Sequence, residues 1–198
     1  SYPAKRMGVK TGMPIWEAKQ HCRDLIIVPA SYGKYQKYSG YVREVFNDYT
    51  DQVESFGLDE AWLDITGSVG LFGSPVKIAK EISVRIKREL GITVSIGVSF
   101  NKITAKLGSD YKKPDAITVI EPDNYKQIVY PLPVGDLLYV GNATQRKLGS
   151  YGIRTIGQLA ETNPETLKGW FGVMGYTLSA FARGLDQTPV AKQNAHTA

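Results

Sequence analysis

The hydrophobic pattern of the chain changes near residue 121, and this change restricts the folds that the chain can adopt. Before that point, strand-like and helix-like runs alternate. After Pro131 the strand signal nearly disappears, and short helical stretches separated by glycines and by Asn163-Pro164 replace it. We therefore expect an α+β fold, with a mixed or antiparallel sheet covered by helices and followed by a small all-helical module. A length of 198 residues is sufficient for both parts.

The individual elements of both parts follow from apolar spacing and from end signals. We expect helices over 15–22, 35–49, 74–90, 101–112, 143–153, 155–162, 163–172 and 173–185, and strands over 25–29, 52–57, 61–66, 92–99 and 116–120, with a connector after Pro122. Tyr35 and Tyr38 are expected on the core face of the second helix. Ser74 is predicted to cap the third helix and Gly91 to end it. Gly97 predicts the close approach of another backbone.

Composition narrows the class of protein. With 42% hydrophobic and 22% charged residues, the sequence is typical of a soluble globular protein and not of a disordered or collagen-like chain. Cys22 is the single cysteine, so it cannot form an internal disulfide, and it fits a reducing compartment. No apolar run has the length of a membrane span. We expect an intracellular, cytoplasmic protein without a membrane partner.

Basic residues are concentrated in one segment. The net charge is +5, from 24 Lys and Arg against 19 Asp and Glu, and between residues 77 and 113 nine basic residues stand against three acidic ones. This concentration favours binding of a polyphosphate or a nucleic acid, although solvation of a charged helix face is the ordinary alternative. A P-loop motif is absent from the sequence. His21 and Cys22 lack further ligands for zinc.

Two adjacent carboxylates occupy the tip of the hairpin predicted over 52–66. Asp59 and Glu60 stand there between otherwise apolar flanks. Hard cations such as Mg²⁺ are bound by one or two carboxylates, and substrate phosphates complete the coordination shell. An ordinary acidic turn is the alternative for this motif alone.

The predicted helix after Asn101 carries Lys102 and Lys106 and is followed by Lys112 and Lys113. A lysine at the far end of this helix could reach phosphates that are held at the hairpin carboxylates. The combination of metal carboxylates, phosphate and lysine is typical of phosphoryl transfer. An exposed basic helix without a ligand is the alternative.

The segment 137–161 has the pattern of a helix-hairpin-helix. A hydrophobic residue, a glycine and a polar residue precede the first helix, and Gly152 separates it from the second. Such a hairpin offers backbone N–H groups at a helix N-terminus to a DNA phosphate without reading the base sequence. A helical turn used only for packing is the alternative.

Taken in order, four motifs resemble those of the Y-family, lesion-bypass DNA polymerases of the DinB/UmuC type. They are SYPAKRMGVKTGMP at the start, LDEAWLD in the hairpin, the SxNKxxAKxxSDxxKP pattern over 99–114, and YVGN before the helix-hairpin-helix. The resemblance runs from Ser1 to about Gln187. It implies partial fingers over 1–31, a palm over 32–120, a thumb over 121–187 and a tail over 188–198.

The resemblance also implies roles for particular residues. Asp59 and Glu60 would be the catalytic, metal-binding carboxylates, and Tyr2, Lys5 and Lys113 would bind the incoming nucleotide. DNA contacts would come from Gly141, Asn142, Ala143, Lys147, Lys102 and Lys106. Two Mg²⁺ ions would be shared with the phosphates of a deoxynucleoside triphosphate, and primer-template DNA with damaged bases would be the other partner. An SOS-response enzyme of this class could bind a sliding clamp through parts beyond this sequence.

Several positions depart from the family pattern. A first palm strand with another metal-binding aspartate is expected before Ser1, and a further DNA-binding domain after Gln187, so we expect the 198-residue chain alone to be inactive. Lys5 replaces an arginine, Gly57 replaces a serine and Tyr139 replaces the first glycine of the thumb hairpin. A non-catalytic DNA-binding relative and another palm-type enzyme such as a nucleotide cyclase are the alternative functions.

Overall fold

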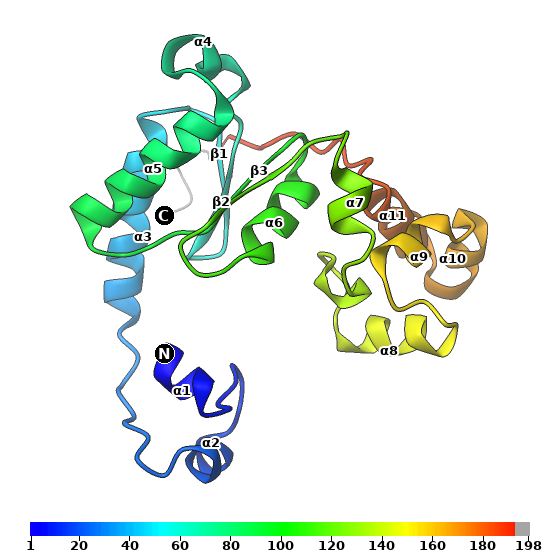
Figure 1. Cartoon of the computed structure of the whole chain (residues 1–198), viewed down its shortest axis with the longest axis horizontal. Helices are drawn as coiled ribbons and strands as arrows, with labels where there is room; N and C mark the ends of the chain where they lie inside the picture. The colour runs from blue at the N-terminus through cyan, green and yellow to red at the C-terminus, as the bar shows by residue number, and fades with distance from the viewer. Residues whose placement is uncertain (193–198) are drawn as a thin grey trace. The chain divides into compact units, whose positions relative to one another are not determined.

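The structure is a computed structural model that describes residues 1–192 (Figure 1). Residues 193–198, which form most of the predicted tail, lie outside the described residues. The chain divides into two compact units, Ser1–Tyr35 and the residues from Gln36 onward.

The first unit is helical and contains two short helices, α1 (Tyr2–Arg6) and α2 (Ile15–His21). The helix α2 was predicted, whereas α1 was not. The first residues of α3 (Tyr32–Asn47) also belong to this unit.

The strand predicted over 25–29 is wrong. These residues have no regular secondary structure, and Ile26 and Val28 are 86% and 76% exposed. A strand requires a hydrogen-bonded neighbour, and residues 1–35 contain no strand that could pair with this segment. Residues 25–29 therefore have the composition of a strand but lack the neighbouring strand with which they would have to pair.

The second unit contains two strand pairs within its described residues. The hairpin β1 (Val53–Phe56) and β2 (Glu60–Leu63) is antiparallel, as predicted, whereas β3 (Ile96–Ser99) and β4 (Ile117–Ile120) are parallel. The two pairs form separate ladders rather than one continuous sheet. Each strand has four residues, fewer than the sequence pattern predicted.

The helix α5 (Pro75–Leu90) has the predicted ends. The Ser74 hydroxyl accepts a hydrogen bond from the backbone N–H of Lys77 (3.3 Å), and Gly91 adopts the left-handed conformation with φ of 69°. The buried face of α5 packs against the C-terminal part of α3 and against Tyr49, two residues beyond its end. This core contains Val45, Tyr49, Ile78, Ile82 and Ile86.

Tyr35 and Tyr38 do not join this core, contrary to the sequence prediction. Their side chains are exposed, and the apolar face of α3 is buried only from Val42 onward, where α5 covers it. Helical spacing placed these rings on the same side as Val45, but burial depends on where the partner helix lies.

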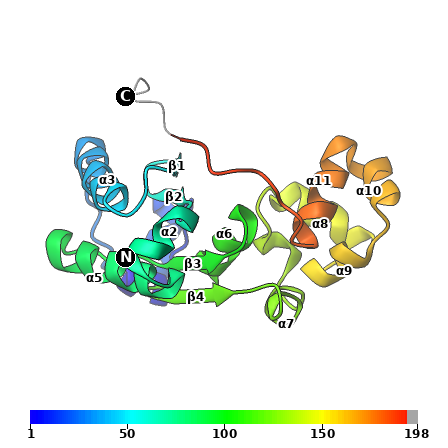
Figure 2. The ribbon, with the colours of Figure 1, turned by 90° about the horizontal axis from the view of Figure 1, so that it is seen from above.

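The helix α6 (Lys102–Tyr111) packs tightly on β3 (Figure 2). A Cβ atom added at Gly97 would lie 1.9 Å from the carbonyl oxygen of Ala105, so only glycine permits this approach. The Asn101 side chain caps α6 by accepting a hydrogen bond from Thr104 N–H (2.9 Å). The predicted close backbone approach at Gly97 is confirmed.

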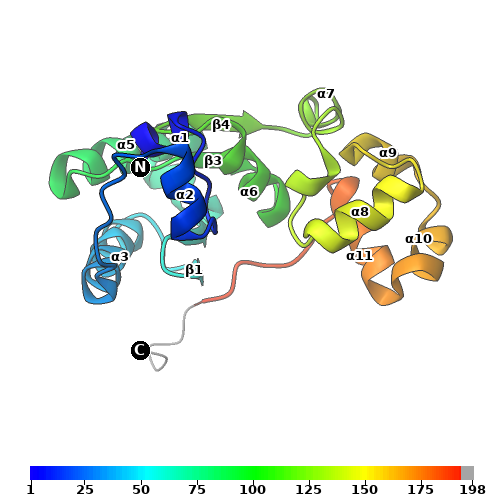
Figure 3. The same cartoon turned by 90° about the horizontal axis from the view of Figure 1, so that it is seen from below.

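Among the described residues after Pro131 the regular elements are helices, as predicted. Figure 3 shows the helices α8 (Asn142–Ser150), α9 (Ile156–Glu161), α10 (Pro164–Phe171) and α11 (Val173–Ala182) grouped together. The sequence prediction missed α7 (Tyr125–Val129) in the expected connector, the short 3₁₀ helices η1 (Thr66–Ser68) and η2 (Val134–Asp136), and α4 (Val69–Phe72).

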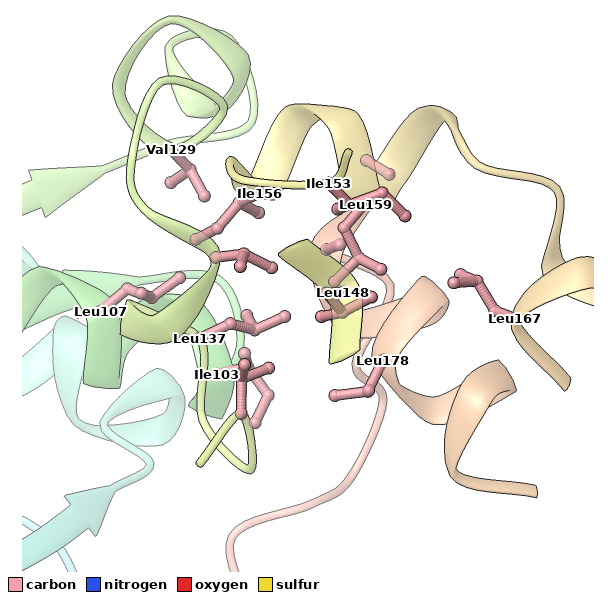
Figure 4. Packing of buried hydrophobic residues seen from close by; sticks show 14 of the residues in the cluster. Ile103, Leu107, Val129, Leu137, Leu148, Ile153, Ile156, Leu159, Leu167 and Leu178 are labelled. Atoms are coloured by element: carbon pink, nitrogen blue, oxygen red, sulfur yellow. The ribbon is translucent and has the colours of Figure 1, made fainter. Parts of the chain in front are cut away.

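The C-terminal helices share a large apolar core with α6 and β4. Ile103 and Leu107 of α6 and Ile120 of β4 join Leu148 and Leu159 of the later helices, and most of these residues are visible in Figure 4. The helical module is therefore held against the sheet region by buried apolar contact. Within residues 1–192 no helix combines the length and apolarity needed to cross a membrane.

Candidate active site

The hairpin β1–β2 presents two chemically different faces. Cross-strand partners point to the same side of a ladder, so the pairs Glu54–Trp62 and Phe56–Glu60 share one face. The rings of Phe56 and Trp62 are 4.9 Å apart on that face. This face lies toward α6, and Figure 1 shows the hairpin between α3 and α6.

The opposite face and the turn are fixed by α3. Arg43 donates from Nε to the Ser55 hydroxyl (2.9 Å) and from Nη2 to the carbonyl of Gly57 (3.1 Å), and the Ser39 hydroxyl donates to the carbonyl of Leu58. Gly57 has a φ of 77°, a conformation that glycine adopts without steric cost. The turn that carries the predicted carboxylates is thus held by two side-chain hydrogen bonds, and a third holds the adjoining strand β1.

Asp59 and Glu60 are adjacent, as the sequence requires, but their environments differ. Asp59 is exposed in the turn, and Glu60 is the half-buried first residue of β2. Glu60 Oε1 accepts a hydrogen bond from Lys106 Nζ at 2.8 Å. Among the described residues, neither the Asp59 carboxylate nor Glu60 Oε2 has a hydrogen bond or an ion pair, so these oxygens are open to a ligand.

Lys102 and Lys106 face the hairpin from successive turns of α6. Lys102 Nζ lies 2.6 and 2.7 Å from the two carboxylate oxygens of Glu54, and 4.6 Å from the centre of the Trp62 ring. The indole N–H of Trp62 donates to the Lys102 carbonyl (2.9 Å). The side chains of Lys102 and Lys106 are only 11% and 16% exposed. DNA contact by these lysines stays a prediction, and the structure gives them a local role as partners of the hairpin carboxylates.

A chain of alternating charges continues from Glu60 along α6. Lys106 Nζ also contacts Asp110 Oδ2 (2.7 Å), and Asp110 Oδ1 contacts Lys113 Nζ (2.6 Å). Burial acts to raise the pKa of Asp110, but the hydrogen bonds from Lys106 and Lys113 outweigh it and lower that pKa. For Lys106 burial acts to lower the pKa, but the bonds to Asp110 and Glu60 raise it. Both shifts favour the charged forms of Asp110 and Lys106 at neutral pH.

The sequence analysis missed the roles of Glu54 and Asp110. The pairing of Glu54 with Lys102 depends on the hairpin register, which places Glu54 on the same face as Glu60. Asp110 follows Lys106 by four residues, a spacing that brings side chains together on a helix. The signal for Asp110 was therefore present in the sequence, whereas the signal for Glu54 required the register of the strands.

Two hairpin carboxylates are a minimal donor set for a metal ion. Within residues 1–192 no group of three or more His, Cys, Asp or Glu side chains is placed to hold an ion. The open oxygens of Asp59 and Glu60 are hard ligands that suit Mg²⁺, which commonly takes one or two carboxylates and completes its shell with phosphate oxygens and water. Asp59 and Glu60 can therefore supply part of the coordination shell of Mg²⁺.

The first helix of the predicted helix-hairpin-helix is α8, and no side chain caps its N-terminus. Gly141 is the N-cap of α8 and provides no side-chain hydrogen bond, and Asn142 and Ala143 follow it on the exposed surface. Tyr139 has a φ of 70°, so the position at which the family pattern has glycine is in the left-handed conformation here. Its ring stacks on Phe181 with the ring centres 6.1 Å apart.

The remaining predicted site residues lie elsewhere. Lys147 donates to the carbonyl of Trp170 and lies 4.8 Å from the centre of the Phe171 ring, so its ammonium is directed toward α10. Tyr2 and Lys5 are exposed on α1, in the first compact unit. Their predicted roles in binding DNA and nucleotide stay predictions.

The arrangement of the hairpin, α6 and the C-terminal helices is similar to that in solved structures of DinB and of a Y-family DNA polymerase chimera. DinB from Sulfolobus solfataricus superposes on the chain with a TM-score of 0.87 and 30% identity, covering 97% of this chain and 57% of that one. An insertion ternary complex of Dbh DNA polymerase gives a TM-score of 0.87 and 31% identity, covering 96% of this chain and 56% of that one.

Sequence profiles give the family. The impB/mucB/samB family profile matches residues 1–110, and the DNA polymerase-iota thumb domain profile matches residues 135–186. The chain belongs to the impB/mucB/samB family. The α+β fold class and the resemblance to DinB-type polymerases, both predicted from the sequence, are confirmed.

Curated relatives are DNA polymerases. DNA polymerase IV of Acetivibrio thermocellus is 54% identical over 194 residues, which are 98% of this chain and 49% of that protein. DNA polymerase IV 1 of Bacillus subtilis is 40% identical over 190 residues, 96% of this chain and 46% of that protein. The chain thus spans about half the length of these relatives.

Proposed function

We propose that this chain forms part of a translesion DNA polymerase that extends a primer along a damaged template by phosphoryl transfer assisted by two Mg²⁺ ions. One observation carries the proposal: the hairpin presents open carboxylate oxygens on Asp59 and Glu60 at one end of a charge chain that ends at Lys113. Carboxylates that can hold cations and a lysine that can hold phosphate are the groups that this reaction needs. Membership of the impB/mucB/samB family supports it.

Different residues of the chain would bind the cations and the triphosphate. Asp59 and Glu60 would hold the cations, and the hydrogen bond from Lys106 would fix the orientation of Glu60 before a cation binds. Bound Mg²⁺ would make the primer 3′-hydroxyl more acidic and would neutralise charge on the triphosphate. Lys113, which is half-exposed, would contact the triphosphate.

Further contacts would come from the other residues that the family resemblance indicates. Tyr2 and Lys5 would also bind the triphosphate. The exposed backbone N–H groups at Gly141, Asn142 and Ala143 would bind a phosphate of primer-template DNA without reading its bases. A cytoplasmic location, an SOS-response role and a sliding-clamp partner belong to the same proposal.

Replacement of a hairpin carboxylate tests the assignment. In the intact polymerase, Asp59→Asn or Glu60→Gln should lower Mg²⁺-dependent primer extension by about 100-fold or more, because charge stabilisation at the reacting phosphate is lost. Binding of primer-template DNA, measured by fluorescence anisotropy at fixed salt, should change less than about twofold.

Asp123→Asn is the matched control for this experiment. Asp123 is exposed, and its carboxylate makes no ion pair or hydrogen bond with other described residues. This variant should retain full primer extension. A loss of DNA affinity that parallels the loss of extension in Asp59→Asn would contradict the proposal and would indicate a structural role for the hairpin.

The uncapped start of α8 favours one second candidate, a non-catalytic protein that binds damaged DNA. Phosphate binding at this helix does not require the hairpin carboxylates. Salt-sensitive DNA binding by the intact protein, without primer extension under any divalent cation, would support this candidate. A nucleotide cyclase has no need of the thumb module, and formation of a cyclic product from nucleotide alone would identify one.

A further inference from the structure

Asp110 connects two parts of the candidate active site, although neither the sequence motifs nor the family match assigns it a role. Its two carboxylate oxygens hold different lysines, with Oδ2 2.7 Å from Lys106 Nζ and Oδ1 2.6 Å from Lys113 Nζ. Lys106 is shared, because the same ammonium group lies 2.8 Å from Glu60 Oε1. Glu60, which would hold a cation, is thus two ion pairs from Asp110, and Lys113, which would hold a triphosphate, is one ion pair from it on the other side.

The shared ammonium makes these contacts interdependent. Lys106 is 16% exposed, so it has little access to water as an alternative partner, and its position depends on Glu60 and Asp110. A cation on Glu60 would repel the Lys106 ammonium and compete with it for the carboxylate. Lys106 would then interact more strongly with Asp110, and Asp110 would hold Lys113 less strongly.

Lys113 is free to respond. Its side chain is 52% exposed, whereas Asp110 is 40% exposed. An exposed ion pair of this kind contributes little to stability and separates at low cost. Release of Lys113 from Asp110 therefore needs only a small change in the charge around the carboxylate.

We infer that Asp110 is a positioning residue that couples cation binding at Glu60 to the release of Lys113 for a triphosphate. The inference rests on the proposed function, because it takes Glu60 as a cation ligand and Lys113 as a phosphate ligand. It adds a specific route by which one ligand would favour the other.

The cation arm uses Mn²⁺ as the probe, titrated into the chain and followed by electron paramagnetic resonance. Asp110→Asn should weaken Mn²⁺ binding by roughly fivefold, because Lys106 then remains on Glu60. In a Lys106→Met background the same substitution should change the affinity by less than about twofold. Equal effects in both backgrounds would indicate that Asp110 attracts the cation directly through space, and would overturn the inference.

The anion arm uses tripolyphosphate in metal-free buffer with a chelator. Asp110→Asn should strengthen tripolyphosphate binding by roughly fivefold, because Lys113 no longer has a competing partner. In a Lys113→Met background this gain should disappear. Asp123→Asn makes the same change in net charge and should alter either affinity by less than about twofold. A gain that persists without Lys113 would overturn the inference.

A spectroscopic arm needs no substitution at the partly buried Lys106. In ¹⁵N-labelled protein, Mg²⁺ should shift the side-chain ammonium signal of Lys113 in the wild type and leave it unchanged in Asp110→Asn. If Glu60→Gln does not weaken Mn²⁺ binding, both the proposed cation site and the proposed coupling are wrong. If Mn²⁺ binds at Glu60 and the Lys113 signal does not move, the coupling alone is wrong.

Discussion

The helix α6 contacts the rest of the second unit through two different sides. One side mainly stabilises the fold, and the other orients charged groups of the candidate site. One side buries Ile103 and Leu107 in the apolar core shared with the C-terminal helices. The other side carries Lys102 and Lys106, which pair with carboxylates of the hairpin. Apolar burial holds the helix in place, whereas partly buried ion pairs add orientation with a smaller net stabilisation.

The largest effect is expected on the apolar side. Leu107→Ala should lower the free energy of unfolding by about 3 kcal/mol, because the side chain is 2% exposed and its removal leaves a cavity. Urea unfolding followed by circular dichroism measures the change. Val84→Ala is the control, because Val84 is exposed on α5 and should change stability by less than about 0.5 kcal/mol. Equal losses in both variants would show that the α6 core is not the main source of stability.

A smaller effect is expected on the charged side, from Glu54→Gln. At pH 7 it should cost about 1 kcal/mol, because Glu54 accepts hydrogen bonds from Lys102 and from the backbone N–H of Ala191. Burial acts to raise the pKa of Glu54, but these two bonds outweigh it and lower the pKa below the ordinary value of 4.5.

The sign of the pH dependence follows from that direction. A depressed carboxyl pKa contributes stability that is fully present above the pKa of the unfolded chain and is lost as the pH falls through the lower folded value. The wild type and Glu54→Gln should therefore differ at pH 7, and the difference should shrink as the pH falls below 4.5. Urea midpoints at several pH values measure this, with Glu121→Gln, at an exposed position, as control. A difference that persists at pH 3 would show that the effect is not ionic.

The smallest effect on stability is expected at the end of the charge chain. Lys113→Met should change the free energy of unfolding by less than about 0.5 kcal/mol, because its ion pair with Asp110 is largely exposed to solvent. Urea unfolding at low and high salt measures it. A loss above about 1 kcal/mol would place Lys113 with the structural contacts of α6 and would weaken its proposed role in triphosphate binding.

Elements with strong local signals were predicted well from the sequence. The ends of α5 follow from Ser74 and Gly91, whose cap geometries are local, and the hairpin follows from two short runs separated by an acidic turn. The strand predicted over 25–29 failed because strand formation needs a partner, and α7 was missed because five residues give too short a periodic signal.

In the candidate site, too, the sequence indicated some of the side chains, whereas only the structure shows how they pair. Asp59 and Glu60 stood out as adjacent carboxylates, and Lys113 stood out within a lysine-rich segment. The sequence did not indicate that Lys102 and Lys106 would be used as partners of the hairpin. That outcome depends on which face of the hairpin meets α6, and only the packed structure shows it.

By itself, therefore, the sequence determined the hairpin, the longer helices, the fold class and the residue types at the site, because short-range spacing and capping act within a few residues. The tertiary structure decided the pairing of Lys102 with Glu54 and of Lys106 with Glu60, across 48 and 46 residues of chain. Such long-range pairing is set by the strand register and by the glycine contact between β3 and α6, and neither has a local signature that fixes its partner.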